Sequence, residues 1–257
     1  SKGWCVFGLR GSGKSWFVKS VLESTPDHLI YDPLKEHVGY NKYTPTDRTS
    51  IDELETVIKG PVIKGIKVTE DNKAMFPTRR VGETWKPELF VIDEANRYIA
   101  PHPKPMPQTV ADLVDYGRHW GCSFGVVARR PVQFNSTLVE LSDHVFLFNL
   151  PGKNDHAYLE SLHSGLGDTV RNLPAHHFVA FSHGSEITVH SPRARIQHSK
   201  HVYGVWIDWG SRVSSSRFLS SQRQPGGHDC RKCRFPYRFR WHGWPRHGQP
   251  SGWRTQS

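Results

Sequence analysis

Residues 8–15 read Gly8-Leu9-Arg10-Gly11-Ser12-Gly13-Lys14-Ser15 and match the pattern GxxxxGK[ST]. The apolar run Trp4–Gly8 predicts a strand before this loop, and Lys14–Glu23 predicts a helix after it. A strand before the loop and a helix after it form the context in which this pattern binds phosphate. The stretch therefore predicts an α/β protein with a phosphate-binding P-loop.

The residue types in the loop suit a nucleoside triphosphate, ATP, bound together with Mg²⁺. Gly11 and Gly13 let the backbone curl so that successive N–H groups point into one concavity, and the helix N-terminus adds partial positive charge. We expect Lys14 to reach the β- and γ-phosphates and the Ser15 hydroxyl to bind Mg²⁺. The predicted nucleotide-binding residues are Gly8, Arg10, Gly11, Ser12, Gly13, Lys14, Ser15 and Trp16.

A second motif, Leu89-Phe90-Val91-Ile92-Asp93-Glu94, is an apolar strand that ends in two acids. The end of such a strand lies at the carboxyl edge of a parallel sheet, beside the P-loop, so Asp93 is expected to hold Mg²⁺. Glu94 suits a general base that polarises the attacking water. Adjacent strand residues point to opposite faces, so both acids reach the site only where the strand gives way to loop.

The rest of residues 1–196 alternates apolar runs with helical patterns, as in a βαβ protein. No apolar run approaches the roughly 18 residues of a membrane span. Cys5 and Cys122 lie in apolar or Gly-flanked contexts and are expected to be buried free thiols. Further strands are predicted at His28–Asp32, Val62–Val68, Ser123–Ala128 and Val145–Leu150, helices at Ser50–Lys59, Thr109–Trp120 and Asp155–His163, and a closing hairpin at Phe178–Ser182 and Glu186–His190.

Residues 197–257 have a different composition from the P-loop domain predicted at 1–196. Nine Arg and two Lys against two Asp give this segment a charge of +9, out of +10 for the whole chain, and it holds five of the nine Trp. It shows no apolar periodicity. An unfolded basic tail, a sequence from a shifted reading frame and a nucleic-acid-binding arm all stay open as interpretations. Cys230 and Cys233 form a lone CxxC, which His228 and His242 would have to complete as a zinc site.

Several further stretches, with the two motifs, resemble the HerA–FtsK superfamily of ring-forming, DNA-pumping ATPases. Within it the chain is most similar to viral genome-packaging ATPases, and the match covers residues 3–192. Leu29–Pro33 resembles the second strand ending in Asp-Pro, Tyr116–Gly121 the GRxxG after a helix, Val126–Pro131 a strand with an Arg-Pro exit, and Ser142–Phe148 the strand after that.

The resemblance implies a P-loop NTPase fold of the RecA/ASCE type. It would have a mostly parallel five-stranded sheet in the order 5-1-4-3-2, with helices on both faces and right-handed crossovers. At the end of the strand after Asp93 the family often has a γ-phosphate-sensing Gln, and this chain has Arg129. Family rings also use an arginine from the neighbouring subunit, for which Arg118, Arg129 and Arg130 are the candidates.

The resemblance further implies a motor that translocates double-stranded DNA into a viral capsid. The implied partners are DNA, other copies of the chain in a ring (a hexamer), and a capsid or portal-vertex protein; the implied location is the host cytoplasm, with association to the virion or procapsid. Two segments, Pro101–Pro107 and Lys64–Arg80, are candidates for contact with DNA phosphates or, alternatively, solvated insertions. A phage-assembly or conjugation-type ATPase, a P-loop kinase and a catalytically silent structural protein are the alternative functions.

Overall fold

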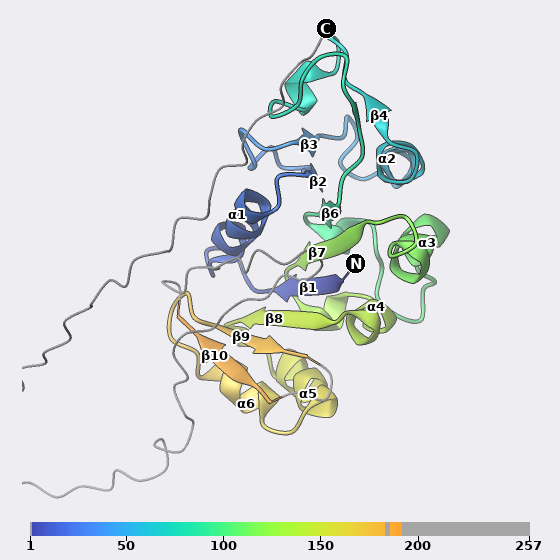
Figure 1. Ribbon diagram of the computed structural model, residues 1–257. Coiled ribbons are helices and arrows are strands. Elements are labelled where there is room, and N and C mark those ends of the chain that lie inside the picture. Colours follow the sequence, from blue (N-terminus) through green and yellow to red (C-terminus); the bar gives the residue numbers. More distant parts are fainter. Residues whose placement is uncertain (1, 183–185, 192–257) are drawn as a thin grey trace, which may run out of the picture. The chain divides into compact units, whose positions relative to one another are not determined.

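The computed structural model describes residues 2–182 and 186–191, which contain an eight-stranded sheet (Figure 1). Its strands are β1 (Gly3–Phe7), β2 (His28–Tyr31), β3 (Lys42–Tyr43), β6 (Leu89–Ile92), β7 (Ser123–Ala128), β8 (His144–Phe148), β9 (Phe178–Phe181) and β10 (Thr188–His190). They lie in the order β10-β9-β8-β1-β7-β6-β2-β3. The pairs from β8 to β3 are parallel, and β9 and β10 pair antiparallel.

This sheet is wider than the predicted one, so the predicted five-strand order 5-1-4-3-2 is wrong for the sheet as a whole. The predicted strands lie together in its centre, as β8-β1-β7-β6-β2. On one side β3 is added, because the N–H groups of Ile30 and Asp32 donate to carbonyls of Asn41 and Tyr43. On the other side the predicted hairpin, β9 with β10, continues the sheet from β8.

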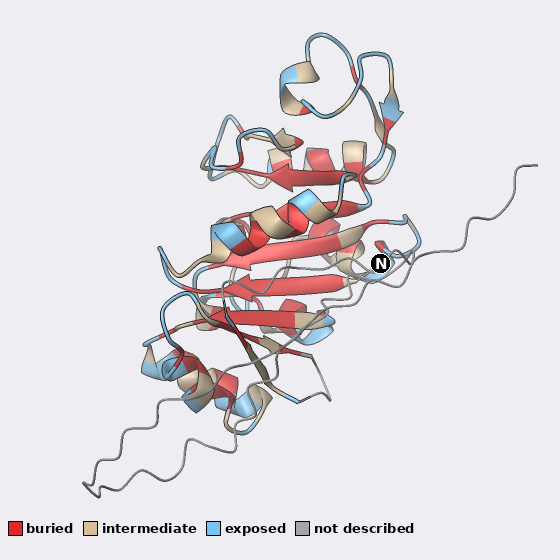
Figure 2. Ribbon diagram, turned by 60° about the vertical axis from the view of Figure 1, so that its left-hand side comes forward, coloured by how far each residue is buried: buried red, intermediate tan, exposed pale blue. Residues whose placement is uncertain are grey.

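Helices cover both faces of the sheet, as predicted, because successive strand residues point to opposite sides. Trp4 and Val6 of β1 pack in one apolar cluster with Phe17 of α1, whereas Cys5 and Phe7 belong to a second cluster on the other face. That second cluster takes apolar side chains from α2 (Asp52–Val57), α3 (Gln108–Tyr116), α4 (Ser136–Leu141), α5 (Lys153–Leu162) and α6 (Leu166–Arg171). The central strands are therefore buried along most of their length (Figure 2).

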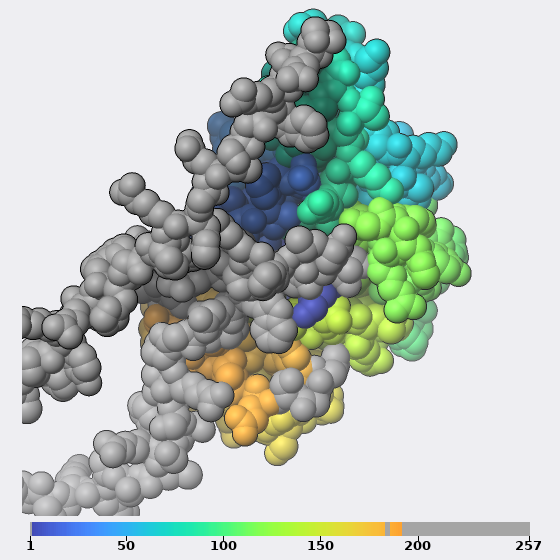
Figure 3. All heavy atoms as spheres, viewed as in Figure 1, coloured from blue at the N-terminus to red at the C-terminus, as the bar shows by residue number. Residues whose placement is uncertain are grey.

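Residues 58–86 form an extension beside the main sheet, and its buried apolar side chains join the second cluster. A π-helical turn, Ile58–Val62, leads to a small antiparallel pair of β4 (Ile66–Lys67) and β5 (Thr84–Trp85), so only the end of the strand predicted at Val62–Val68 forms. The space-filling view shows this extension at one end of the sheet and α5, α6 and the β9–β10 hairpin at the other (Figure 3).

The two cysteines of the P-loop domain are buried free thiols, as predicted. Burial raises the pKa of Cys5 and of Cys122 to about 12. No helix in the described ranges is long and apolar enough to cross a membrane. The boundary at residue 196, the basic tail and the CxxC with its two histidines lie outside the described residues.

Candidate active site

The P-loop connects β1 to α1 (Lys14–Ser24) through backbone angles that favour glycine. Gly11 has φ +76° and Gly13 has φ +113°. Gly8 is required for space, because a Cβ there would lie 2.6 Å from Ser12 Oγ and 2.7 Å from Phe148 Cβ. The shape of the loop at the helix N-terminus therefore depends on these three positions.

Lys14 lies across the inside of this loop. Its ammonium donates to the carbonyls of Gly8, at 2.6 Å, and Leu9, at 3.0 Å. Burial lowers the pKa of Lys14, and the nearby carboxylates of Glu94 and Asp93 oppose that shift. A phosphate group entering the loop would take over these hydrogen bonds and compensate the buried charge, so the position of Lys14 fits an anionic ligand.

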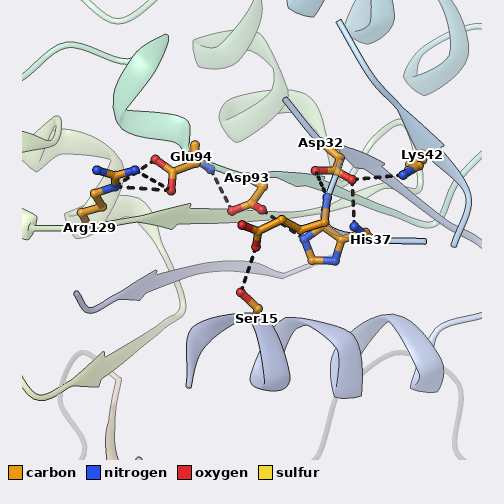
Figure 4. A network of polar contacts seen from close by, with 8 residues as sticks. Ser15, Asp32, His37, Lys42, Asp93, Glu94 and Arg129 are labelled. Carbon is orange, nitrogen blue, oxygen red and sulfur yellow. Dashed lines mark hydrogen bonds and ion pairs between the residues drawn. The ribbon is translucent and has the colours of Figure 1, made fainter. Parts of the chain in front are cut away.

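Asp93 and Glu94 follow β6 at the same edge of the sheet. Asp93 N–H still donates to the Tyr31 carbonyl at 3.0 Å and so continues the pairing with β2. Glu94 has φ +49°, a left-handed conformation that ends the strand's alternation. Both carboxylates consequently face one cleft, as Figure 4 shows.

The Asp93 carboxylate is held by two donors. One oxygen accepts the Glu94 N–H at 2.8 Å, and the other lies 3.0 Å from His37 Nε2. The fully buried Asp32, at the end of β2, accepts the His37 N–H at 2.9 Å, and Lys42 Nζ lies 3.4 Å from the same oxygen. His37 belongs to no motif of the sequence, and the Asp-Pro at the end of a strand is the one sequence signal that points to Asp32.

The three predicted arginines occupy different surroundings. Arg129, directly after β7, lies with its Nε 3.1 Å from a Glu94 carboxylate oxygen. Arg130 turns to the other side and donates to the buried Asp155 of α5 at 2.8 Å, so it is engaged within its own chain. Arg118 lies between α3 and the first residue of β7, at the opposite edge of the sheet from the P-loop, and does not line the cleft of its own chain.

The cleft between these groups has a volume of about 500 Å³. Ser15 Oγ, the Asp93 carboxylate and the Glu36 carboxylate face it, and oxygen donors of this kind fit Mg²⁺. Gly8 and Ser12 belong to the loop without lining the cleft. The predicted residues that line it are Arg10, Gly11, Gly13, Lys14, Ser15, Trp16, Asp93, Glu94 and Arg129, and those not predicted are Val18, Leu34, Glu36, His37, Arg97 and Val127.

The segment Lys64–Arg80 offers fewer free cations than the sequence indicated. Arg79 pairs with Asp27 at 2.7 Å and stacks on the Trp85 ring, and Lys73 donates to backbone carbonyls of its own loop. Lys64, Lys67 and Arg80 are exposed, as are residues 101–105 of the Pro-rich segment. Of the five cations in this segment, Lys73 and Arg79 are therefore engaged within the chain.

No protein-family model matches the sequence, and no curated protein matches it. Several solved structures match the chain. The DNA-packaging ATPase B204 from Sulfolobus turreted icosahedral virus matches with a TM-score of 0.56 and 16% identity, over 74% of this chain and 97% of that one. The genome-packaging NTPase B204 from Sulfolobus turreted icosahedral virus 2, in complex with AMPPCP, matches with a TM-score of 0.55 and 19% identity, over 74% and 97%.

The chain shares the fold of these packaging NTPases. A further structure of the second virus protein, in complex with ATP-gammaS, gives a TM-score of 0.54 at 19% identity, over 75% of this chain and 97% of that one. The resemblance drawn from the sequence motifs is thus confirmed at the level of the fold.

Proposed function

We propose that the chain is an ATP-hydrolysing, ring-forming motor that translocates double-stranded DNA and packages a viral genome into a capsid. The observation that carries the proposal is the meeting of Lys14, Ser15, Asp93 and Glu94 at one cleft on the carboxyl edge of the sheet. Because β7 lies between β1 and β6, the loop and the two acids stand on either side of one strand. The cleft between them, of about 500 Å³, would take a γ-phosphate and an attacking water.

In this proposal the loop N–H groups and Lys14 hold the β- and γ-phosphates, and Ser15 and Asp93 hold Mg²⁺. When bound there, the cation would supply positive charge to neutralise the phosphate oxygens. Glu94 takes a proton from water as the water oxygen attacks the γ-phosphorus and the bond to the β–γ bridging oxygen breaks. Arg129, at the end of the strand between the motifs, is placed to contact the γ-phosphate once it leaves Glu94.

The proposed partners follow from the packaging proteins that share the fold. Double-stranded DNA is the proposed track, and a capsid or portal-vertex protein the proposed docking partner in the host cytoplasm or at the procapsid. The proposed assembly is a ring of identical subunits, a hexamer. In such a ring, Arg118 is proposed to contribute its guanidinium to the site of the neighbouring subunit. Since Arg118 lies at the edge of the sheet opposite its own cleft, it is a candidate for a neighbour's cleft only.

The test is the ATPase rate of the full chain with and without linear double-stranded DNA. We expect DNA to stimulate Mg²⁺-dependent hydrolysis, and Glu94→Gln to lower kcat by at least about 100-fold while nucleotide still binds, because a general base contributes about 10²–10⁴-fold. Glu140→Gln, an exposed change on α4, is the matched control and should leave the rate unchanged.

Hydrolysis that is indifferent to DNA would contradict the packaging motor and favour an assembly-type ATPase of the same fold. Phosphate transfer to a small acceptor in place of water would favour a kinase. An unchanged rate in Glu94→Gln would remove Glu94 from the role of base.

A further inference from the structure

We propose that His37 is a positioning residue of the Mg²⁺ site, whose imidazole holds the Asp93 carboxylate in the orientation that the cation needs. The inference rests on the proposed function, because it names what orients a side chain proposed to bind Mg²⁺. Neither motif contains His37, which follows the end of β2 in a loop.

The Asp93 carboxylate has no free rotation in this arrangement. One oxygen accepts the N–H of the next residue at 2.8 Å, and the other meets His37 Nε2 at 3.0 Å. A carboxylate only accepts, so Nε2 carries the hydrogen. With Asp93 8% exposed, few waters are available to replace this donor. The ring therefore decides which lone pairs of Asp93 remain directed into the cleft.

The backbone that carries the ring is fixed by Asp32. The fully buried Asp32 accepts the backbone N–H groups of Glu36, at 3.1 Å, and His37, at 2.9 Å, which closes the turn after β2. Lys42 of β3 lies 3.4 Å from the same Asp32 carboxylate. The ends of two neighbouring strands, β2 and β6, are thus joined through the His37 side chain (Figure 4).

The stability of the fold does not explain why a histidine occupies this buried position. His37 is 1% exposed, and its other ring nitrogen, Nδ1, has no hydrogen-bond partner within the described ranges. A buried polar atom without a partner destabilises the fold, so an apolar side chain would suit the core better. The hydrogen bond to Asp93 is therefore the contact that explains a histidine at this position. Replacing a residue that hydrogen-bonds to a metal-binding carboxylate typically lowers metal affinity or activity about 10–100-fold.

Direct ligation is the competing role, because the donor atoms of Asp32, His37 and Asp93 lie within 4.8 Å of one another. Two observations favour positioning. Nε2 is already directed at Asp93, and Mg²⁺ prefers oxygen to imidazole. An amide in place of the ring can still donate to Asp93 but makes a poor transition-metal ligand, which separates the two roles.

The test compares His37→Leu and His37→Gln in the full chain, with His28→Leu as control. His28 is similarly buried and makes two hydrogen bonds, neither of them to the cleft. The readouts are the Mg²⁺ concentration for half-maximal ATPase, and calorimetric binding of AMPPCP with Mg²⁺ and with EDTA. We expect His37→Leu to raise the half-maximal Mg²⁺ concentration about tenfold or more. Binding in EDTA should stay unchanged, and His37→Gln should recover most of the loss.

Equal weakening of AMPPCP binding with and without Mg²⁺ would overturn the proposal, since a merely structural role predicts that result. Wild-type Mg²⁺ dependence in His37→Leu would overturn it too, while leaving the proposed function standing. Loss of Mg²⁺ affinity in both variants would overturn positioning through a hydrogen bond, because the Gln amide can still donate to Asp93. A wild-type chain that binds no Mg²⁺–AMPPCP would refute the proposed function itself.

Discussion

Glu94 and Arg129 carry opposite charges and lie in contact, and their pairing bears on when hydrolysis can occur. The Glu94 side chain is 13% exposed and Arg129 is 50% exposed, so the guanidinium is the partner free to move. While the two are paired, the guanidinium lies against the carboxylate oxygens that would have to accept a proton from water. A γ-phosphate in the cleft offers Arg129 a second anionic partner, and the exchange would free Glu94 for water.

Arg129 should therefore matter more for turnover than for nucleotide affinity. Removing one donor to charge that develops in the transition state costs about 10²–10³ in kcat, so we expect Arg129→Ala to lower kcat by about 100-fold. Arg129→Gln should keep more activity than Arg129→Ala, because the Gln amide can still donate a hydrogen bond. Gln is the residue that the HerA–FtsK superfamily often has at this position. Steady-state kinetics and AMPPCP titration measure the two effects, with the exposed Arg171→Ala as control. A change in KM alone would contradict the role.

At the level of elements, the Arg130–Asp155 pair joins the exit of β7 to α5. Asp155 is 1% exposed and its second oxygen has no hydrogen-bond partner in the part of the chain described, so Arg130 supplies its main compensation. Removing one partner of a fully buried pair costs about 3–5 kcal/mol, and the partial exposure of Arg130 reduces that figure. We expect Arg130→Ala to lower the free energy of unfolding by about 2 kcal/mol, measured by urea denaturation.

The paired change separates packing from charge. Arg130→Met with Asp155→Leu removes both charges together and should recover most of the loss, because no buried charge is left alone. A stability of Arg130→Ala equal to that of wild type would mean that water already compensates Asp155.

Sequence patterns predicted the elements whose signal is local. The apolar runs at β1, β6, β7 and β8 identified the core strands, and α1 begins at Lys14, as the P-loop motif required. β3 was missed because a two-residue strand has no pattern of its own and exists through pairing with β2. Among the helices, α3 stops at Tyr116 and not Trp120, where Gly117 begins a series of turns.

Ser50 and Glu53 match the sequence pattern of a capping box at the start of α2, but this box does not form. Glu53 turns to the N–H groups of Thr46 and Asp47 and to the Tyr43 hydroxyl, instead of bonding back to Ser50. The site residues also divide into those with a local sequence signal and those without one. The P-loop and the two acids are contiguous motifs, whereas the contact of His37 with Asp93 depends on β2 lying beside β6.

At the scale of the molecule, the cleft lies near the middle of a sheet with different surfaces at its two ends. The extension of residues 58–86 lies toward the β3 end, and α5 and α6 toward the β10 end (Figure 1). The proposed motor would have to couple the cleft to DNA through one such surface. Lys64, Lys67 and Arg80 of the extension are exposed and form no ion pair with another described residue, so they are better candidates for DNA phosphates than Arg79, which is paired.

Replacing Lys64, Lys67 and Arg80 together by Gln should weaken DNA binding in a way that salt dependence identifies. Each lost phosphate contact lowers the slope of log K against log salt by about 0.9, so the triple variant should lose up to about 2.7. Fluorescence anisotropy with a short duplex, from low to moderate salt, measures that slope. The control replaces Lys153 and Arg171, exposed cations on α5 and α6, by Gln. If the control flattens the slope and the triple variant does not, the α5–α6 end is the DNA-binding surface, because counterion release reports where the phosphates are neutralised.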